Sequence, residues 1–204
     1  MTAALVVGLT GGIGVGKSTA AAMLGRHGAV VVDCDALGRN VIEPDGRAFA
    51  AVVERFGPGV LGADGRIDRA ALAAIVFKDA GSLAALNGIS HPAMDVEIAE
   101  AIAAAPEDSI VVLDMAVLVE SNLGKGQYEL VVVVEAALDV RLLRLEQRGV
   151  AHDDALARIA SQVGDEQRRA VADVILRNDD GLEALEADVA MLWDELRARA
   201  DGAR

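Results

Sequence analysis

A glycine-rich segment near the amino terminus carries a lysine and a hydroxyl residue at a spacing that suits phosphate binding. Residues 5–24 read LVVGLTGGIGVGKSTAAAML, in which Gly11, Gly16, Lys17 and Ser18 meet the pattern G-x-x-x-x-G-K-[ST]. A short β-branched apolar run precedes the motif and an alanine-rich stretch follows it, so the motif joins a predicted strand to a predicted helix. This is the context that a phosphate-binding P-loop requires.

Each residue type in this loop has a chemical task. The glycines at 11, 12, 14 and 16 are expected to allow positive φ and to remove Cβ atoms, so that main-chain N–H groups converge on phosphate oxygens. Lys17 offers a charge to β- and γ-phosphates, and the Ser18 hydroxyl is a ligand that Mg²⁺ prefers. We therefore predict that a polyphosphate contacts Gly11, Gly12, Ile13, Gly14, Val15, Gly16, Lys17, Ser18 and Thr19. A dinucleotide-binding pattern starting at Gly14 fails, because Thr19 stands where it needs glycine.

Two carboxylates close the next apolar run. Asp33 and Asp35 end the segment VVVDCD, and side chains two apart in an extended segment point to the same side. Both are therefore expected to reach the cleft above the carboxyl ends of the strands, where one accepts a proton from a substrate hydroxyl or organises Mg²⁺ through water. The alternative is a helix N-cap or turn. The pattern does not divide these roles between the two residues.

Asp114 ends a further apolar run, IVVLD, as the metal-shell aspartate of a P-loop enzyme does. With Ser18 it is our second predicted Mg²⁺ ligand, although an aspartate there equally caps a local turn. Glu120 follows shortly after it.

Phosphoryl transfer concentrates negative charge on the moving group, so arginines are its expected partners. Arg141, Arg144 and Arg148 lie on one predicted helix, with the last two on the same face. Further arginines at 158, 168 and 169 follow. For all of them the alternative is an exposed ion pair with a neighbouring Asp or Glu.

Two further residues have simpler interpretations. His91 precedes Pro92, which suits the first turn of a helix, and taken alone His91 is a capping or packing residue. Cys34 lies between the two aspartates, is expected to face the other side of the strand, and is predicted to fill the core.

Alternating strands and helices must position these residues. We predict strands at 5–9, 29–32, 110–113, 130–134 and 174–176, and helices at 18–27, 92–105, 138–148, 153–163 and 182–199. The alternation implies right-handed crossovers and a parallel sheet covered on both faces. About 75 residues separate the second and third strands, far more than one crossover helix needs. We therefore expect one domain, residues 1–204, with a core at 1–36, 109–140 and 170–204, a helical insertion at 37–108 and a lid at 141–169.

The composition excludes several classes of partner. Hydrophobic residues make up 53% of the 204 residues but only one Trp, one Tyr and three Phe are present, so the core is predicted to be aliphatic and base-stacking modules are disfavoured. A net charge of −13 opposes binding to nucleic acid and to anionic membranes. One cysteine and no apolar run of spanning length lead us to expect a cytoplasmic protein.

The P-loop is one of several motifs that this chain shares with a known family. They are Gly8-Leu9-Thr10-Gly11-Gly12-Ile13-Gly14, Gly16-Lys17-Ser18-Thr19, Asp33-x-Asp35 with Leu37 and Arg39, Phe56-Gly57, Asp64-Gly65-Arg66-Ile67-Asp68-Arg69, Leu86-Asn87-Gly88-Ile89 before His91-Pro92, Arg144 with Arg148, Arg158 with Gln162, and Ala172-Asp173 before Asn178. With them, the chain from about Leu5 to Gly181 resembles the dephospho-coenzyme A kinase family.

The resemblance implies a P-loop three-layer α/β sandwich with a five-stranded parallel sheet, a helical insertion that binds the acceptor and a small lid over ATP. It implies transfer of the γ-phosphate of ATP, with Mg²⁺, to the ribose 3′-hydroxyl of dephospho-coenzyme A, the last step of coenzyme A synthesis. The implied catalytic residues are Asp35 as the favoured base, Lys17, Asp33 and Arg144. Arg144, Arg148 and Asn178 are implied on the ATP side, and Asp35, Arg39, Asp68, Arg69, His91 and Glu120 on the acceptor side.

One segment departs from the family pattern. Where the family has Pro-Leu-Leu-[Phe/Val]-Glu after the third strand, this chain has Ala116-Val117-Leu118-Val119-Glu120. The proline's fixed φ is lost while apolar bulk and Glu120 remain, so we expect an altered turn on the acceptor side and intact ATP binding.

Two alternative functions remain for the chain: another nucleotide or nucleoside kinase, and a non-catalytic nucleotide-dependent switch. As partners we expect only small molecules, ATP and dephospho-coenzyme A, and a monomer or weak homo-oligomer.

Overall fold

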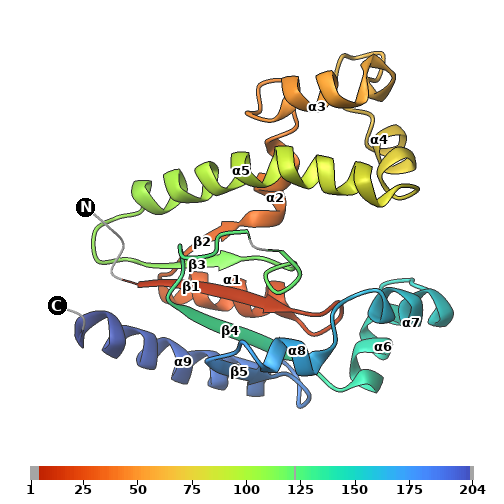
Figure 1. Cartoon of the computed structure of the whole chain (residues 1–204). Coiled ribbons are helices and arrows are strands. Elements are labelled where there is room, and N and C mark those ends of the chain that lie inside the picture. The colour runs from red at the N-terminus through yellow and green to blue at the C-terminus, as the bar shows by residue number, and fades with distance from the viewer. Residues whose placement is uncertain (1–4, 122, 203–204) are drawn as a thin grey trace. The chain divides into compact units, whose positions relative to one another are not determined.

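Five parallel strands in the order β2-β3-β1-β4-β5 form the sheet of this protein (Figure 1). The structure is a computed structural model that describes residues 5–121 and 123–202. The strands are β1 (Leu5–Gly11), β2 (Val30–Asp33), β3 (Ile110–Asp114), β4 (Leu130–Glu135) and β5 (Val174–Arg177). The predicted five-stranded parallel α/β fold is confirmed.

The chain divides into two compact units. The first contains the described residues up to Asp33 and from Ala101 onward, and the second is Cys34–Glu100. The helices of the first unit are α1 (Lys17–His27), α6 (Leu138–Gln147), α7 (His152–Ala160), α8 (Asp165–Arg169) and α9 (Leu182–Gly202).

The second unit is helical. It holds α2 (Cys34–Asn40), α3 (Phe49–Phe56), the short 3₁₀ helix η1 (Pro58–Val60), α4 (Arg69–Val76) and most of α5 (Ala80–Ala104). A single antiparallel bridge joins Leu61 to Ile67 around the turn at Gly65. Asp68 caps α4 by accepting hydrogen bonds from the N–H groups of Ala70 and Ala71.

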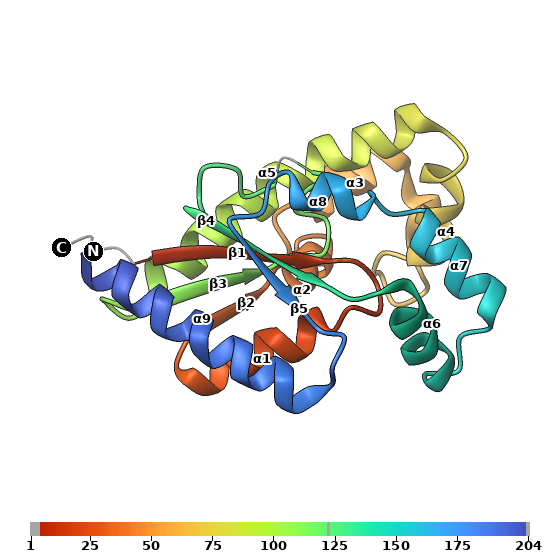
Figure 2. The same ribbon diagram turned by 90° about the horizontal axis from the view of Figure 1, so that it is seen from below.

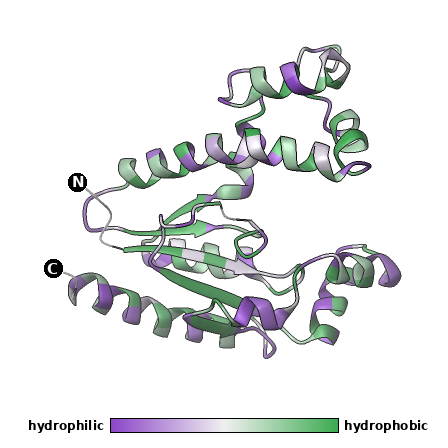
Figure 3. Cartoon of the chain, in the orientation of Figure 1, coloured by the Kyte–Doolittle hydropathy of each residue, from purple (hydrophilic) through white to green (hydrophobic). Residues whose placement is uncertain are grey.

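The core of the first unit is aliphatic, as predicted. All residues of β1 and β4 are buried, whereas the edge strands β2 and β5 are partly exposed, as the strand order requires. Figure 3 shows β3 and β4 coloured hydrophobic. Helices α1 and α9 lie side by side on one face of the sheet (Figure 2) and complete the cluster with Leu24 and Val189.

Two predicted elements differ from the structure. The second strand ends at Asp33 and α2 begins at once with Cys34, so Asp35 lies in the first turn of a helix. Asp33 and Asp35 therefore do not alternate along one extended strand, and that prediction was wrong, although Cys34 is buried as predicted. Pro92 does not open a helix but lies inside α5, whose apolar side chains Met94 and Ile98 are buried. Proline is tolerated in the first turn of a helix but loses a hydrogen bond and clashes with a carbonyl group in the interior, so the sequence pattern favoured a helix start at Pro92.

No helix among residues 5–121 and 123–202 is both long enough and apolar enough to span a membrane.

Candidate active site

The P-loop connects the carboxyl end of β1 to the first turn of α1. Gly14 and Gly16 have φ values of 84° and 96°, a backbone conformation that glycine adopts at little cost. A side chain at Gly16 would also collide with Asn178, whose Nδ2 would lie 2.3 Å from the added Cβ. Both glycines are therefore required by the loop geometry.

Gly11 and Gly12 are needed for a different reason, and the expectation of positive φ for them was wrong. Gly11 is the last residue of β1, where a Cβ would lie 2.6 Å from the carbonyl oxygen of Val134. At Gly12 a Cβ would lie 2.7 Å from Nη2 of Arg141. These glycines allow the chain to approach its neighbours closely.

The loop forms the floor of a cavity of about 250 Å³ within the first unit. The lining residues are Gly11, Gly12, Ile13, Gly14, Gly16, Lys17, Ser18, Thr19, Ala116, Arg148 and Gln162. The start of α1 contributes main-chain N–H donors and the positive end of its dipole, so the cavity favours an anion. Most of the loop residues predicted to contact phosphate are thus brought together, and Val15 is buried beneath them.

A second cavity, of about 290 Å³, shares Gly16, Thr19 and Arg148 with the first. It is lined in addition by Arg144, Gln147, Asn178, Leu182 and Leu185. Apolar side chains beside an amide are suited to a nucleoside, and the shared residues place that position next to the phosphate cavity. Arg148 is the arginine common to both.

Lys17 forms an ion pair with Asp114, which ends β3. Asp33 is the register partner of Asp114 on the neighbouring strand β2, so the carboxyl edge of the sheet carries two adjacent aspartates. No group of three or more His, Cys, Asp or Glu side chains within the described residues could hold a metal ion. Mg²⁺ needs no such cage, because it keeps waters and takes substrate phosphates, so an oxygen pair such as Ser18 and Asp114 fits its chemistry.

Arg144 and Asn178 stabilise the P-loop through hydrogen bonds that lead to Val15. Nη2 of Arg144 donates to the carbonyl oxygen and to Oδ1 of Asn178 at 2.9 and 3.1 Å. Asn178 in turn donates from Nδ2 to the carbonyl oxygen of Val15 at 2.8 Å. Both side chains also line the second cavity.

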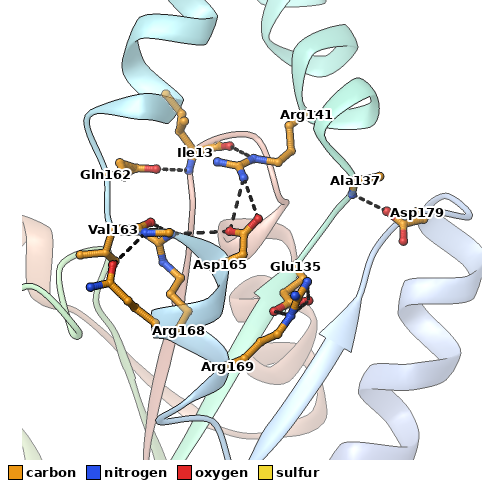
Figure 4. A network of polar contacts seen from close by, with 12 residues as sticks. Ile13, Glu135, Ala137, Arg141, Gln162, Val163, Asp165, Arg168, Arg169 and Asp179 are labelled. Carbon is orange, nitrogen blue, oxygen red and sulfur yellow. Dashed lines mark hydrogen bonds and ion pairs between the residues drawn. The ribbon is translucent and has the colours of Figure 1, made fainter.

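Arg141 is buried and holds the loop from another side (Figure 4). Its Nε donates to the carbonyl oxygen of Ile13 at 2.9 Å, and its Nη1 lies 3.4 Å from Oδ2 of Asp165. Burial lowers the pKa of the Arg141 guanidinium, Asp165 opposes that change, and the neighbouring Arg168 adds to it. The sequence predicted Arg141 as a phosphate partner, with an exposed ion pair as the alternative; it did not indicate this burial, which depends on the distant loop at Ile13.

Arg168 continues this network inside the predicted lid segment. It is 1% exposed, donates from Nη2 to Oε1 of Glu120 at 3.1 Å and lies 3.7 Å from Asp165. Glu120 therefore ties the segment after β3 to α8. Arg169 is paired with the buried Glu135 at 2.8 Å, and neither Arg169 nor Arg158 lines the P-loop cavity.

The residues predicted for the acceptor side, apart from Glu120, belong to the second unit. Asp35 and Arg39 lie on the first and last turns of α2, and His91 lies within α5. Asp68 is the N-cap of α4, and Arg69 donates to Oε1 of Glu43 at 2.9 Å. These partners give Asp68 and Arg69 a structural task within their own unit.

Comparison with known proteins gives the family. The model of the family described as dephospho-CoA kinase matches residues 5–184. The chain belongs to the dephospho-coenzyme A kinase family. It is an ATP-dependent kinase, and its activity is the final step of coenzyme A synthesis. The resemblance predicted from the motifs is thus confirmed.

Similar proteins support the assignment. The chain is 47% identical over 196 residues to a dephospho-CoA kinase of Thermobifida fusca, covering 96% of this chain and 98% of that protein. Among solved structures, a Thermus thermophilus protein matches with a TM-score of 0.79 and 33% identity, over 94% of this chain and 97% of that one. The fold is also that of a dephospho-CoA kinase from Campylobacter jejuni, with a TM-score of 0.69 and 21% identity over 95% and 97% of the two chains.

Proposed function

We propose that the chain binds ATP with its triphosphate on the P-loop and transfers the γ-phosphoryl group to the ribose 3′-hydroxyl of dephospho-coenzyme A. The observation that carries this proposal is the cavity of about 250 Å³ whose wall contains Lys17, Ser18 and the loop backbone. A hard anion of high charge is the ligand that such a wall favours.

Asp35 is the proposed general base. It follows Asp33, at the carboxyl edge of the sheet, by only two residues, and the first turn of α2 carries it. The ribose oxygen forms a bond to the γ-phosphorus as the bond from that phosphorus to the β–γ bridging oxygen breaks. The hydroxyl proton passes to the carboxylate, and ADP leaves with the bridging oxygen. Asp33 is the alternative base.

Positive side chains stabilise the charge that develops on the transferred group. Lys17 lines the phosphate cavity, and Arg148 lines both cavities. Arg144 acts on the same site through Asn178 and Val15. Lys17 is held by Asp114 and Arg144 by Asn178 before the reaction, so these two groups require little reorganisation in the transition state.

Mg²⁺ is proposed to be held by Ser18 and Asp114, where it would supply charge neutralisation on the phosphate oxygens. The ion pair between Lys17 and Asp114 keeps this carboxylate beside the cavity wall.

The acceptor is proposed to bind to the Cys34–Glu100 unit with Arg39, Asp68, Arg69 and His91, together with Glu120 of the first unit. In the three-part division we propose, all of this unit from position 37 onward falls within the insertion at 37–108, and the lid at 141–169 contains most of α6 together with α7 and α8. The loop 116–120 lacks the family's proline, yet Glu120 is anchored by Arg168. We propose that this pair replaces the proline in fixing the turn.

For the cellular setting we propose a cytoplasmic enzyme that is a monomer or a weak homo-oligomer and that binds neither nucleic acid nor membranes. The net charge of −13 supports the exclusion of anionic polymers and surfaces. Sedimentation velocity over a range of protein concentrations tests the oligomeric state.

An acceptor panel tests the proposed substrate. Purified protein with MgATP is given dephospho-coenzyme A, AMP, CMP or a nucleoside, and ADP release is followed by a coupled assay. We expect a value of kcat/KM for dephospho-coenzyme A at least about 100-fold above the others, because the acceptor unit must recognise more than a nucleotide. Faster turnover of AMP or CMP would overturn the assignment of the acceptor.

A further inference from the structure

Gln162 reaches the P-loop from the segment between α7 and α8. Its Oε1 accepts a hydrogen bond from the N–H group of Ile13 at 2.8 Å, although 149 positions separate the two residues (Figure 4). The side chain is half-buried and forms part of the wall of the P-loop cavity. A residue of the predicted lid segment thus touches the main chain that is expected to bind phosphate.

The orientation of this carboxamide is fixed by its oxygen. A glutamine side chain has an acceptor oxygen and an amide NH₂ group with two N–H donors. Here the oxygen accepts the hydrogen bond from Ile13. The amide group at Nε2 forms no hydrogen bond with any residue in the ranges 5–121 and 123–202. Two donors are therefore available on a side chain that lines the same cavity as Lys17.

The segment that Gln162 contacts is held firmly. The carbonyl oxygen of Ile13 accepts from Nε of Arg141 at 2.9 Å, so both main-chain polar groups of Ile13 are engaged by side chains. At Gly12 an added Cβ would lie 2.7 Å from Arg141 Nη2 and 3.4 Å from Gln162 Oε1. The hydrogen bond between Gln162 and Ile13 is therefore part of a packed cavity wall.

The position of Gln162 within the cavity favours a contact with the terminal phosphate. Gly16, Thr19 and Arg148 are shared with the second cavity, which holds Asn178 and is suited to the nucleoside. Ile13 and Gln162 line the first cavity alone. These two residues therefore lie at the end of the site opposite the nucleoside. The terminal phosphate of a bound triphosphate is expected at that end.

We propose that Gln162 is a phosphate-binding residue that donates from Nε2 to an oxygen of the γ-phosphoryl group while Oε1 remains on Ile13. This inference rests on the proposed function to the extent that the first cavity is the triphosphate site. The contact distinguishes ATP from ADP, because only ATP offers the third phosphate. It also adds a donor that opposes the charge developing on the transferred group.

Two variants separate the donor role from a purely structural one. Gln162→Glu keeps an acceptor for the N–H group of Ile13 but replaces the donors by a negatively charged oxygen, whereas Gln162→Met removes both functions at similar size. Gln167→Glu is the matched control. It makes the same change on a side chain whose Oε1 also accepts from a backbone N–H, that of Gly164 at 3.1 Å, but which lies outside the P-loop cavity.

Dissociation constants for MgATP and MgADP are measured by calorimetry, together with kcat. For Gln162→Glu we expect ATP binding to weaken at least tenfold, ADP binding to change less than threefold and kcat to fall. Gln162→Met should weaken ATP binding less than Gln162→Glu does, since it adds no repulsion. Gln167→Glu should leave both constants within twofold.

Other results overturn the inference. If Gln162 only holds Ile13, Gln162→Glu will bind ATP like the wild-type protein and Gln162→Met will be the weaker binder. If Gln162 only obstructs the loop, both variants will bind ATP more tightly. If the variants show the expected changes in ATP and ADP binding but the wild-type protein does not phosphorylate dephospho-coenzyme A, the proposed function is refuted and this inference still stands.

Discussion

Lys17, in the first turn of α1, forms an ion pair with Asp114 at the carboxyl end of β3. The two residues are 97 positions apart in the chain, and the parallel pairing of β1 with β3 brings them together. One is the proposed partner of the β- and γ-phosphates and the other a proposed Mg²⁺ ligand. Helix α1 and strand β3 therefore position the ammonium group of Lys17 and the carboxylate of Asp114, the two charges proposed to bind MgATP.

Replacing Lys17 by alanine should lower the transfer rate by about 100- to 1,000-fold, because it removes a fixed charge from the phosphate site. The rate is measured by ADP release in the presence of dephospho-coenzyme A. Lys125→Ala, which removes an exposed lysine outside both cavities, is the control. Undiminished transfer in Lys17→Ala would rule out the proposed role of the loop.

Asp35→Asn should lower kcat by about 10²- to 10⁴-fold and leave the dissociation constant of MgATP within about twofold, since a base acts mainly in the transition state. Asp33→Asn, measured beside it, decides which aspartate is the base. A parallel loss of ATP affinity in Asp35→Asn would instead make Asp35 a metal-site or structural residue.

Gly16→Ala should abolish measurable ATP binding and destabilise the fold by about 1–3 kcal/mol, because the residue has positive φ and its new Cβ would meet Asn178. Gly149→Ala is matched to it. Gly149 has a φ of 83° but nothing within 4 Å of an added Cβ, so it reports the backbone cost alone. Urea unfolding and calorimetry are the measurements, and equal effects of the two substitutions would contradict the contact with Asn178.

Arg141→Met should destabilise the protein by about 1–3 kcal/mol in urea unfolding, since it leaves the carbonyl oxygen of Ile13 without its buried donor. Arg158→Met, on the exposed surface of α7, should change stability by no more than about 0.5 kcal/mol. If the two variants were equally stable, Arg141 would not be a brace of the P-loop.

Local patterns in the sequence were sufficient for the sheet and the phosphate loop. The buried apolar runs at β1, β3 and β4 have the length and composition of central parallel strands, and the motif from Gly11 to Ser18 has one established geometry. The family was predicted from motifs spread along the chain and is confirmed.

Features that depend on long-range packing were not predictable from those patterns. Arg141 was predicted as a phosphate partner, with an exposed ion pair as the alternative. It is instead buried against Ile13, and no short-range pattern encodes a contact over 128 residues. Gln162 appeared only as part of a family motif, without a role. The helix start at Cys34 was missed because alternation along a strand gives no signal for where the strand ends.

The central claim is that a triphosphate held by the P-loop gives its terminal phosphoryl group to the hydroxyl of dephospho-coenzyme A. The direct test is incubation of the purified protein with MgATP and dephospho-coenzyme A, followed by product mass and phosphorus NMR. We predict one ADP for each acceptor consumed and one phosphate gained at the ribose 3′ position. Release of ADP at the same rate without acceptor, or a product that has gained no phosphate there, would contradict the account.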